Sequence, residues 1–312
     1  MTAMPRTYNL VIVGAGPAGM AAGIYGARMG LKTLILGETL GGMAAENALV
    51  ENYPGFLQTS GLDLMGRMRE QAERWGAEVH TPEKALKLHV QHRKHEVKTN
   101  VTIYTGVALL IATGCTHRKL GVPGEDEFRG RGVSYCATCD GPLFKGRKVM
   151  VVGGGNTAAT ETLYLNELAA KVYLVHRRDE LRAEETLKKR ILESDVEVLW
   201  NSSVKSIEGE RTVKNVKLRD SKTDEERMIE VDGVFISVGE DPQSDIARAA
   251  GIAVHDDGNI VVNRLQESNI GGIYAAGDVT GGVLQIGTAV GEGITAAVNA
   301  YLYVSGGWYG KK

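Results

Sequence analysis

The sequence is poor in cysteine, proline and aromatic residues, and it lacks a strong net charge. Of 312 residues, 3 are cysteine, 7 are proline and 6% are aromatic, while 36 Lys and Arg nearly balance 38 Asp and Glu. Three cysteines, an odd number, are not the pattern of a secreted disulfide framework. The net charge of −2 gives no reason to expect binding to nucleic acid or to an anionic membrane. We therefore expect a protein of the reducing cytoplasm.

Long apolar runs are also missing from the sequence. No run approaches the 18 or so residues that span a bilayer, and residues 1–9 hold no apolar core of a signal peptide. Glycine, by contrast, is abundant, since 40 of the 312 residues is roughly twice the usual share of about 7%. A chain of this length favours two domains.

A first glycine-rich motif, G-x-G-x-x-G, spans Gly14 to Gly19. It follows the apolar run Leu10–Val13 and precedes a helical pattern and a second apolar run, Leu31–Leu36, which is the context that a dinucleotide fingerprint requires. The glycines allow a tight turn and a close approach of the backbone to pyrophosphate, which would lie on the helix N-terminus. Glu38, just after the second run, is expected either to bind a ribose hydroxyl or to be a solvated turn residue.

The same pattern returns later in the chain as G-x-G-x-x-A, from Gly153 to Ala158. An apolar run, Lys148–Val152, precedes it, and a helical pattern and another apolar run follow, so the sequence contains an internal repeat of the βαβ unit.

The two copies differ after their second strand, where the first has an acid and the second a basic cluster that contains His176, Arg177, Arg178 and Arg182. Arginines bind a 2′-phosphate through charge-assisted hydrogen bonds, whereas a carboxylate would repel it. The second site is therefore predicted to take NADP(H). The alternative is a solvated basic turn that pairs with the neighbouring acids Asp179, Glu180, Glu184 and Glu185.

Between the two glycine motifs lies a C-x-x-C pair, Cys136 and Cys139, followed at once by Asp140. Such a pair can close as a disulfide or open to a dithiol with a lowered thiolate pKa, and the carboxylate could transfer the proton of the exchange. A zinc site would need two more ligands, and Cys115 and His117 are poorly spaced for it. Cys115 is expected to be an inert buried thiol. A redox pair between two nucleotide sites indicates an electron relay.

Other segments have plainer interpretations. Residues 62–75 and 284–304 predict helices, the second rich in small residues suited to close approach to a ring system or another helix. Short alternating segments over 78–104 predict antiparallel strands with His92 and His95 exposed, and residues 41–43 predict a loop. The carboxylate of Asp278 could hold a sugar hydroxyl near the first nucleotide site. The glycine-rich tail, 305–312, is expected to be loose.

Taken in order, the two glycine motifs, the C-A-T-C-D run, the H-R-R cluster and the G-D segment resemble low-molecular-weight thioredoxin reductases over nearly the whole chain. The resemblance implies an α/β fold of two Rossmann-like, three-layer ββα dinucleotide-binding domains, the second inserted into the first. The FAD domain would comprise residues 1–119 and 246–312. The NADPH domain, 120–245, would carry the redox pair. A homodimer is also implied.

The resemblance also implies site residues. Matched motif by motif, the FAD site would comprise Gly14, Gly16, Pro17, Ala18, Gly19, Glu38, Gly41, Gly42, Met43, Asn52, Ala112, Thr113, Gly114, Asp278 and Gln285. The NADPH site would comprise Gly153, Gly155, Asn156, Thr157, His176, Arg177, Arg178 and Arg182. Cys139 would lie nearest the flavin, Cys136 would attack the thioredoxin disulfide, and Asp140 would be the acid–base group. No metal is expected. The sequence departs from the family at Met43, where glutamine is usual, and at Leu284, where arginine often stands.

The expected activity is electron transfer from NADPH through FAD and the Cys136–Cys139 disulfide to a thioredoxin or thioredoxin-like protein. The resemblance implies that the inserted domain rotates about hinges near 118–132 and 239–243. Two alternatives share the motifs. One is the flavoprotein reductase of an alkyl hydroperoxide system, which has an extra N-terminal region with its own cysteines. The other is a flavin- and nucleotide-binding redox sensor without disulfide turnover. Ferredoxin–NADP reductases of related architecture lack the C-x-x-C pair.

Overall fold

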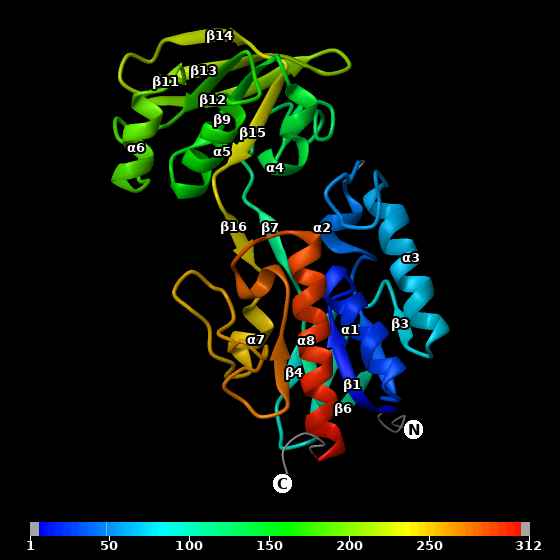
Figure 1. The fold of residues 1–312 in the computed structure, drawn as a ribbon. Helices are drawn as coiled ribbons and strands as arrows, with labels where there is room; N and C mark the ends of the chain where they lie inside the picture. Colours follow the sequence, from blue (N-terminus) through cyan, green and yellow to red (C-terminus); the bar gives the residue numbers. More distant parts are fainter. Residues whose placement is uncertain (1–5, 48, 307–312) are drawn as a thin grey trace. The chain divides into compact units, whose positions relative to one another are not determined.

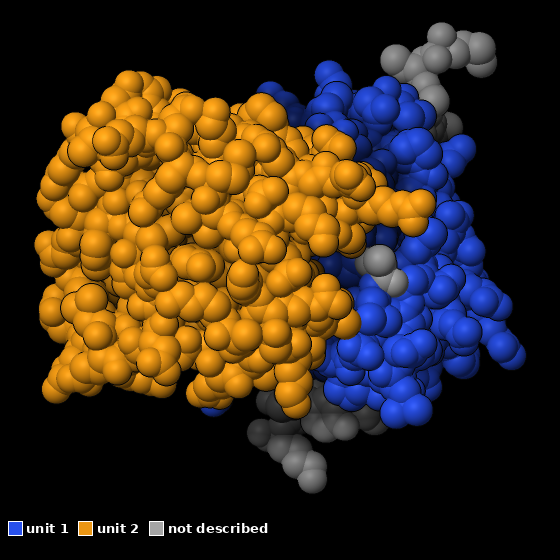
Figure 2. Space-filling view, turned by 90° about the horizontal axis from the view of Figure 1, so that it is seen from above, with its two compact units in different colours: residues 1–116, 241–312 blue, residues 117–240 orange. Residues whose placement is uncertain are grey.

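The computed structural model describes residues 6–47 and 49–306 and divides the chain into two compact units (Figures 1 and 2). Unit 1 comprises residues 1–116 and 241–312, and unit 2 comprises residues 117–240, so unit 2 is inserted into the sequence of unit 1. The two connecting segments, β7 (Cys115–His117) and β16 (Glu240–Pro242), pair with each other as a short sheet. Of the tail that we expected to be loose, Ser305 ends a helix, and 307–312 lie outside the described residues.

Unit 1 is built on a parallel sheet in the order β3-β2-β1-β6, with β17 also paired to β6. The strands are β1 (Arg6–Val13), β2 (Thr33–Leu36), β3 (Glu78–His80), β6 (Ile103–Ile111) and β17 (Ile273–Ala275). The sheet continues antiparallel through β5 (His95–Thr99) to β4 (Ala85–His89). The expectation of antiparallel strands over 78–104 is therefore right for β4 to β6 and wrong for β3, which pairs in parallel with β2.

The central strand β1 is buried on both faces, as its continuous apolar run predicts. On one face, Leu10 and Ile12 pack under α1 (Pro17–Arg28), α3 (Gly61–Arg74) and α8 (Ile286–Ser305). On the other, Val11 and Val13 pack with residues from β4, β5, α7 (Asp245–Ala249) and the segment that leads to β17. Unit 1 thus has its sheet between a helical layer and a second covering layer.

Helices α1 and α8 lie side by side in unit 1 (Figure 1). A Cβ on Gly293 of α8 would overlap the backbone of Ala18 in α1, so the small residues of α8 permit the close approach to another helix that we predicted. Local signals fix both ends of α8. Gln285 and Thr288 form a reciprocal capping box, and Gly306 ends the helix in the left-handed conformation.

Two local expectations for unit 1 are wrong. Residues 42–45 form the short helix α2 (Gly42–Ala45) and are not a loop, because Gly41 takes a left-handed conformation that starts the turn. His92 lies exposed in a turn, but His95 is buried, with 1% of its surface exposed. Burial lowers the pKa of His95, so it is held as a neutral core histidine.

Unit 2 repeats the three-layer plan. Its parallel sheet has the strand order β11-β10-β9-β15-β8. The strands are β8 (Val133–Ser134), β9 (Lys148–Gly153), β10 (Lys171–Val175), β11 (Glu197–Leu199) and β15 (Gly233–Ser237). Helices α4 (Ala137–Asp140), α5 (Asn156–Asn166) and α6 (Glu185–Leu192) and the 3₁₀ turn η1 (Gly141–Phe144) cover one face. An antiparallel sheet covers the other, from β12 (Ser202–Gly209), β13 (Val213–Asp220) and β14 (Glu226–Glu230). The predicted internal repeat is confirmed.

Across the described residues, no helix is both long and apolar enough to cross a membrane.

Candidate active site

The first glycine turn joins β1 to α1 in unit 1. Gly14 has a φ of +122°, and a Cβ there would overlap the carbonyl oxygen of Ala112 at the end of β6. A Cβ on Gly19 would in turn overlap the carbonyl of Gly14. Glycine is therefore required at both positions by the packing of the turn itself. Pro17 occupies the first turn of α1, where its missing N–H has no partner to lose.

Other glycines of unit 1 are not required by packing. A Cβ on Gly42 would meet nothing closer than the Cα of Gly16, at 3.9 Å, and a Cβ on Gly16 would meet only the carbonyl of Gly41, also at 3.9 Å. A side chain at either position would thus make only ordinary van der Waals contact, next to the uncapped N-terminus of α1. Backbone N–H groups at a helix N-terminus fit the phosphates of a dinucleotide.

Asp278 follows β17 in the 3₁₀ turn η2 (Asp278–Thr280), and three contacts hold this turn in place. The Cys115 thiol donates to the Asp278 carbonyl (3.0 Å), and Glu292 of α8 accepts the N–H of Gly277 (2.7 Å) and the hydroxyl of Thr280 (3.3 Å). Cys115 is buried and outside any disulfide, as predicted. These contacts fix the backbone on both sides of a half-buried carboxylate.

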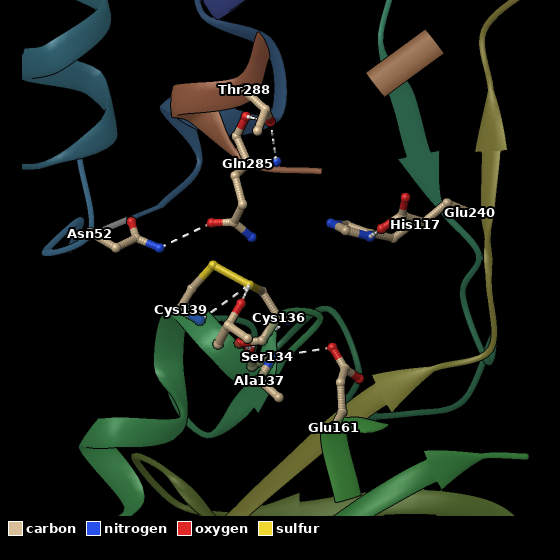
Figure 3. Close-up of a disulfide and its surroundings, with 11 residues drawn as sticks. Asn52, His117, Ser134, Cys136, Ala137, Cys139, Glu161, Glu240, Gln285 and Thr288 are labelled. Carbon is tan, nitrogen blue, oxygen red and sulfur yellow. Dashed lines mark hydrogen bonds and ion pairs between the residues drawn. A yellow bond between two sulfur atoms is a disulfide. The ribbon is translucent and has the colours of Figure 1, made fainter. Parts of the chain in front are cut away.

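The remaining predicted flavin residues occupy several places in unit 1. Asn52 donates to the side chain of Gln285 (3.0 Å), at the start of α8 (Figure 3). Thr113 donates to the carbonyl of Gln243 (2.7 Å) beyond the end of β6, and Gly114 beside it takes a φ of +69°. Met43 is half-buried in α2. Glu38 is exposed and forms an ion pair with Lys84 (2.8 Å), a surface contact that adds little stability.

The second glycine turn, in unit 2, joins β9 to α5. A Cβ on Gly154 would overlap the ring of His176, whose Nδ1 lies 2.8 Å from the carbonyl oxygen of Gly153. His176 is buried against this glycine turn, and burial lowers its pKa, which favours the neutral ring. Gly155, by contrast, has open space beside it, next to the exposed Asn156 and Thr157. As in unit 1, a glycine at which a side chain would clash stands close to a glycine at which it would not.

The three arginines of the basic cluster are exposed. The acids that could neutralise them bond elsewhere: Asp179 pairs with Lys222 (3.2 Å), Glu180 and Glu185 with Lys188 (2.7 Å each), and Glu184 accepts from Asn156 (3.1 Å). Within the described part of the chain, none of Arg177, Arg178 and Arg182 has an acidic partner. The structure therefore disfavours the interpretation of this cluster as a self-neutralised surface turn.

Cys136 and Cys139 form a disulfide at the start of α4 (Figure 3). Cys136 precedes the first residue of α4, and its Sγ accepts the N–H of Cys139 (3.2 Å), while its own N–H donates to Ser134 (3.0 Å). Burial raises the pKa of Asp140, an effect partly offset by a hydrogen bond with Ser134. A carboxyl whose pKa is raised keeps its proton to higher pH than usual, which suits it to donate a proton.

The residue before the disulfide is also firmly held. The Tyr135 hydroxyl donates to Glu125 (2.6 Å), and the His117 ring stacks on the Tyr135 ring, with centroids 4.6 Å apart. Glu125 is buried and also accepts the N–H groups of Leu120 (2.9 Å) and Gly121 (2.7 Å). The segment that enters unit 2 is thus tied to the redox-active turn.

Sequence reasoning missed several residues around these sites, above all Glu161, whose carboxyl accepts the N–H of Ala137 (3.3 Å). It missed Ser134, Glu125 and Glu292 as well, since none of them belongs to the glycine motifs, the C-x-x-C pair or the basic cluster. For Glu161, helical spacing was an available signal. It lies three residues after the buried Ala158 and four before the buried Leu165, which places it on the inward stripe of α5.

Comparison with known proteins places this geometry in a family. Residues 8–293 match the family model described as pyridine nucleotide-disulphide oxidoreductase. A curated thioredoxin reductase of Bacillus subtilis is 43% identical over 304 residues, 96% of this chain and 95% of that protein. The crystal structure of a thioredoxin reductase from Streptococcus pyogenes has a TM-score of 0.91 at 38% identity, over 96% of this chain and 99% of that one. A ferredoxin-flavin thioredoxin reductase from Clostridium acetobutylicum is 34% identical with a TM-score of 0.51, over 96% and 99% of the two chains.

The chain therefore belongs to the pyridine nucleotide-disulphide oxidoreductases and, within them, to the low-molecular-weight thioredoxin reductases. The predicted resemblance is confirmed, and so is the predicted α/β fold with two parallel-sheet dinucleotide-binding domains. Membership of this family implies a flavin and a pyridine nucleotide as cofactors.

Proposed function

We propose that the protein is an NADPH-dependent thioredoxin-disulfide reductase with FAD as its flavin. The observation that carries this proposal is the Cys136–Cys139 disulfide, which closes the start of α4 beside a half-buried acid, in the unit that also carries a glycine turn and an unpaired arginine cluster. Full-length similarity to thioredoxin reductases supports the same reaction.

FAD would be held by unit 1 and NADPH by unit 2. The phosphates of the flavin nucleotide fit at the uncapped N-terminus of α1, beside Gly16 and Gly42. The Asp278 carboxylate fits a ribityl or ribose hydroxyl. In unit 2, Gly155 at the start of α5 fits the pyrophosphate of the nicotinamide cofactor. When bound, the flavin would supply transfer of an electron pair from the nicotinamide to the disulfide.

The protein's own residues then do the thiol chemistry. The electron pair breaks the Sγ–Sγ bond, Cys139 takes up a proton, and the Cys136 thiolate attacks the disulfide of a thioredoxin or thioredoxin-like protein. The mixed disulfide is resolved by Cys139, which restores the Cys136–Cys139 bond and releases the partner's second sulfur; that sulfur takes a proton from solvent, and the partner leaves as a dithiol. Asp140, whose pKa is raised by burial, supplies the proton to the first leaving sulfur and takes it back from Cys139.

The exposed arginines favour NADPH as the donor. Arg177, Arg178 and Arg182 follow the second strand of the βαβ unit, where the ribose of a bound dinucleotide is recognised, and their charges are available to a 2′-phosphate. NADH has no such phosphate. The ferredoxin-flavin relative makes a reduced ferredoxin the donor to be tested beside the two nucleotides.

Three further features belong to the proposal. The partner is a thioredoxin or a thioredoxin-like protein, as the names of the relatives suggest. The enzyme works as a homodimer in the cytoplasm, where a C-x-x-C pair is more often catalytic than structural. Gel filtration with light scattering, and fractionation of the source cells, test the last two.

The decisive experiment is anaerobic. The flavoprotein is mixed with a thioredoxin and with NADPH, NADH or reduced ferredoxin in turn, and donor oxidation is followed. We expect fast turnover with NADPH, abolished in Cys136→Ser and Cys139→Ser, while both variants still pass electrons from NADPH to a dye through the flavin. Thioredoxin reduction that survives in both variants would rule out the relay. Flavin reduction without any disulfide turnover would instead support a redox sensor.

A further inference from the structure

Glu161 lies outside every motif in the sequence, yet its carboxyl contacts the redox-active turn. It projects from α5, and one of its oxygens accepts the N–H of Ala137, the first residue of α4 and the neighbour of Cys136 (Figure 3). It also forms a hydrogen bond with Ser237, at the end of β15. Three elements of unit 2 therefore meet at one carboxyl.

The surroundings of Glu161 disfavour its charge. Burial raises its pKa and the nearby Glu240 raises it further, whereas the bonds from Ser237 and Ala137 and the charge of His117 lower it. Glu240 lies on β16 and His117 on β7, and the two form an ion pair at 3.3 Å. From α4, the titratable groups on this side are the cysteine pair and Asp140, whose pKa is also raised by burial.

The first turn of α4 also donates a hydrogen bond to the sulfur of Cys136. The Cys136 Sγ accepts the N–H of Cys139, while Glu161 accepts the N–H of Ala137, two residues earlier. Once the disulfide opens, a thiolate on Cys136 and a carboxylate on Glu161 of α5 would place two negative charges beside the first turn of α4. Like charges at this range disfavour each other's ionisation.

We propose that Glu161 is a positioning residue of the redox pair and that it gains a proton when Cys136 becomes a thiolate. In the oxidised protein the turn carries one negative charge, on Glu161. Two electrons break the Sγ–Sγ bond, one proton goes to Cys139, and a second proton goes from solvent to Glu161, so that the one negative charge moves to Cys136. The net charge of the turn is the same in both redox states.

The first test counts protons. The holoenzyme is equilibrated with dithiothreitol redox buffers between about pH 6 and pH 8, below the usual thiol pKa of about 8.5, and the dithiol fraction is measured by alkylation and mass spectrometry. Dithiothreitol releases two protons when it is oxidised in this pH range, and the wild-type pair takes up two, so the equilibrium constant of the exchange should not depend on pH. In Glu161→Gln the pair takes up only one proton wherever Cys136 is a thiolate, so the constant should rise about tenfold per pH unit.

The second test measures the Cys136 thiolate directly. In the reduced holoenzyme, the pH midpoint for alkylation of Cys136 by iodoacetamide should be the same in wild type and Glu161→Gln, because Glu161 is neutral wherever Cys136 is a thiolate; a midpoint about one unit lower in Glu161→Gln would show that Glu161 keeps its charge beside the thiolate and would contradict the proton uptake. Glutamine keeps an oxygen for the Ala137 amide, so this variant separates the charge from the support. Glu161→Ala removes both and should also lower the thermal midpoint. Glu167→Gln, an exposed acid just beyond α5, is the matched control and should behave as wild type.

A redox equilibrium with the same pH dependence in wild type and Glu161→Gln would overturn the proposal, even if Glu161→Ala were destabilised, because the role would then be structural alone. Dithiothreitol reduces the pair without nucleotide or thioredoxin. That failure would therefore leave the proposed enzymatic activity untouched, and a failure of NADPH-dependent turnover would not affect this result.

Discussion

Replacing Arg177 and Arg178 together by alanine should reduce the preference for NADPH sharply and leave the use of NADH almost unchanged. Both side chains are exposed, and the acids next to them pair with Lys222 and Lys188. Among the described residues, no ion pair of Arg177 or Arg178 has to break before these arginines bind a phosphate. Their whole interaction with a 2′-phosphate would therefore appear in the affinity for NADPH.

The size of the effect follows from the kind of bond. A hydrogen bond to a charged group contributes about 1.5–3 kcal/mol, and the lower end applies here because the guanidinium groups are exposed to solvent. Each arginine then contributes about tenfold, and the pair about a hundredfold, in kcat/KM for NADPH. The contribution should shrink as ionic strength rises, since exposed charges are screened.

The assay compares kcat/KM for NADPH and NADH, with thioredoxin as acceptor, at low and high salt. Arg190→Ala, which removes an exposed arginine from the last turn of α6, is the matched control and should change neither value. If the double variant lost activity equally with both nucleotides, or with neither, the assignment of the basic cluster to the 2′-phosphate would be wrong.

Two further predictions concern buried carboxyls. Because burial raises the pKa of Asp140, its carboxyl stays protonated to higher pH than usual, and thioredoxin reduction by the wild-type protein should slow at alkaline pH as Asp140 ionises. Asp140→Asn should be slower by about 10²-fold or more, and its pH–rate profile should lack this alkaline decrease. An unchanged rate in this variant would exclude an acid role for Asp140. Burial also raises the pKa of Glu292, so the folded protein holds the proton of this carboxyl more tightly than the unfolded chain does. The protonated carboxyl therefore contributes to the free energy of unfolding at acid pH, and this contribution is lost as pH rises through the pKa of the folded state. Glu292→Gln, which can still accept from Gly277, should therefore match the wild-type thermal midpoint at acid pH and exceed it near neutral pH; a lower midpoint in both conditions would contradict this reasoning.

The features that the sequence predicts well are those set by near neighbours. A Cβ on Gly19 would overlap the carbonyl of Gly14, five residues earlier, and this requirement for glycine follows from the spacing of the motif. The apolar run of β1 predicts burial on both faces, because successive residues of a strand point to opposite faces of the sheet. Such patterns identified both βαβ units and the redox pair between them.

The errors and omissions depend on what a distant segment places against a residue. His95 is an exception, because it shares the face of β5 that holds the buried Val97 and Thr99, so strand alternation was an available signal for its burial. The segment at β3 is too short for periodicity to tell parallel from antiparallel pairing. Glu161 has an inward position on its helix, but only the folded chain brings α4 to it.

The insertion of unit 2 has a consequence for the order in which the protein can form during synthesis. The ribosome completes residues 117–240 before it makes β17 and α8, and both belong to unit 1, where β17 pairs with β6 and α8 packs against α1. The unit that begins first along the chain must therefore finish last. Until the final helix emerges, the apolar faces of α1 and β6 remain uncovered, so a nascent or truncated chain would hold a folded second unit joined to an incomplete, aggregation-prone first one.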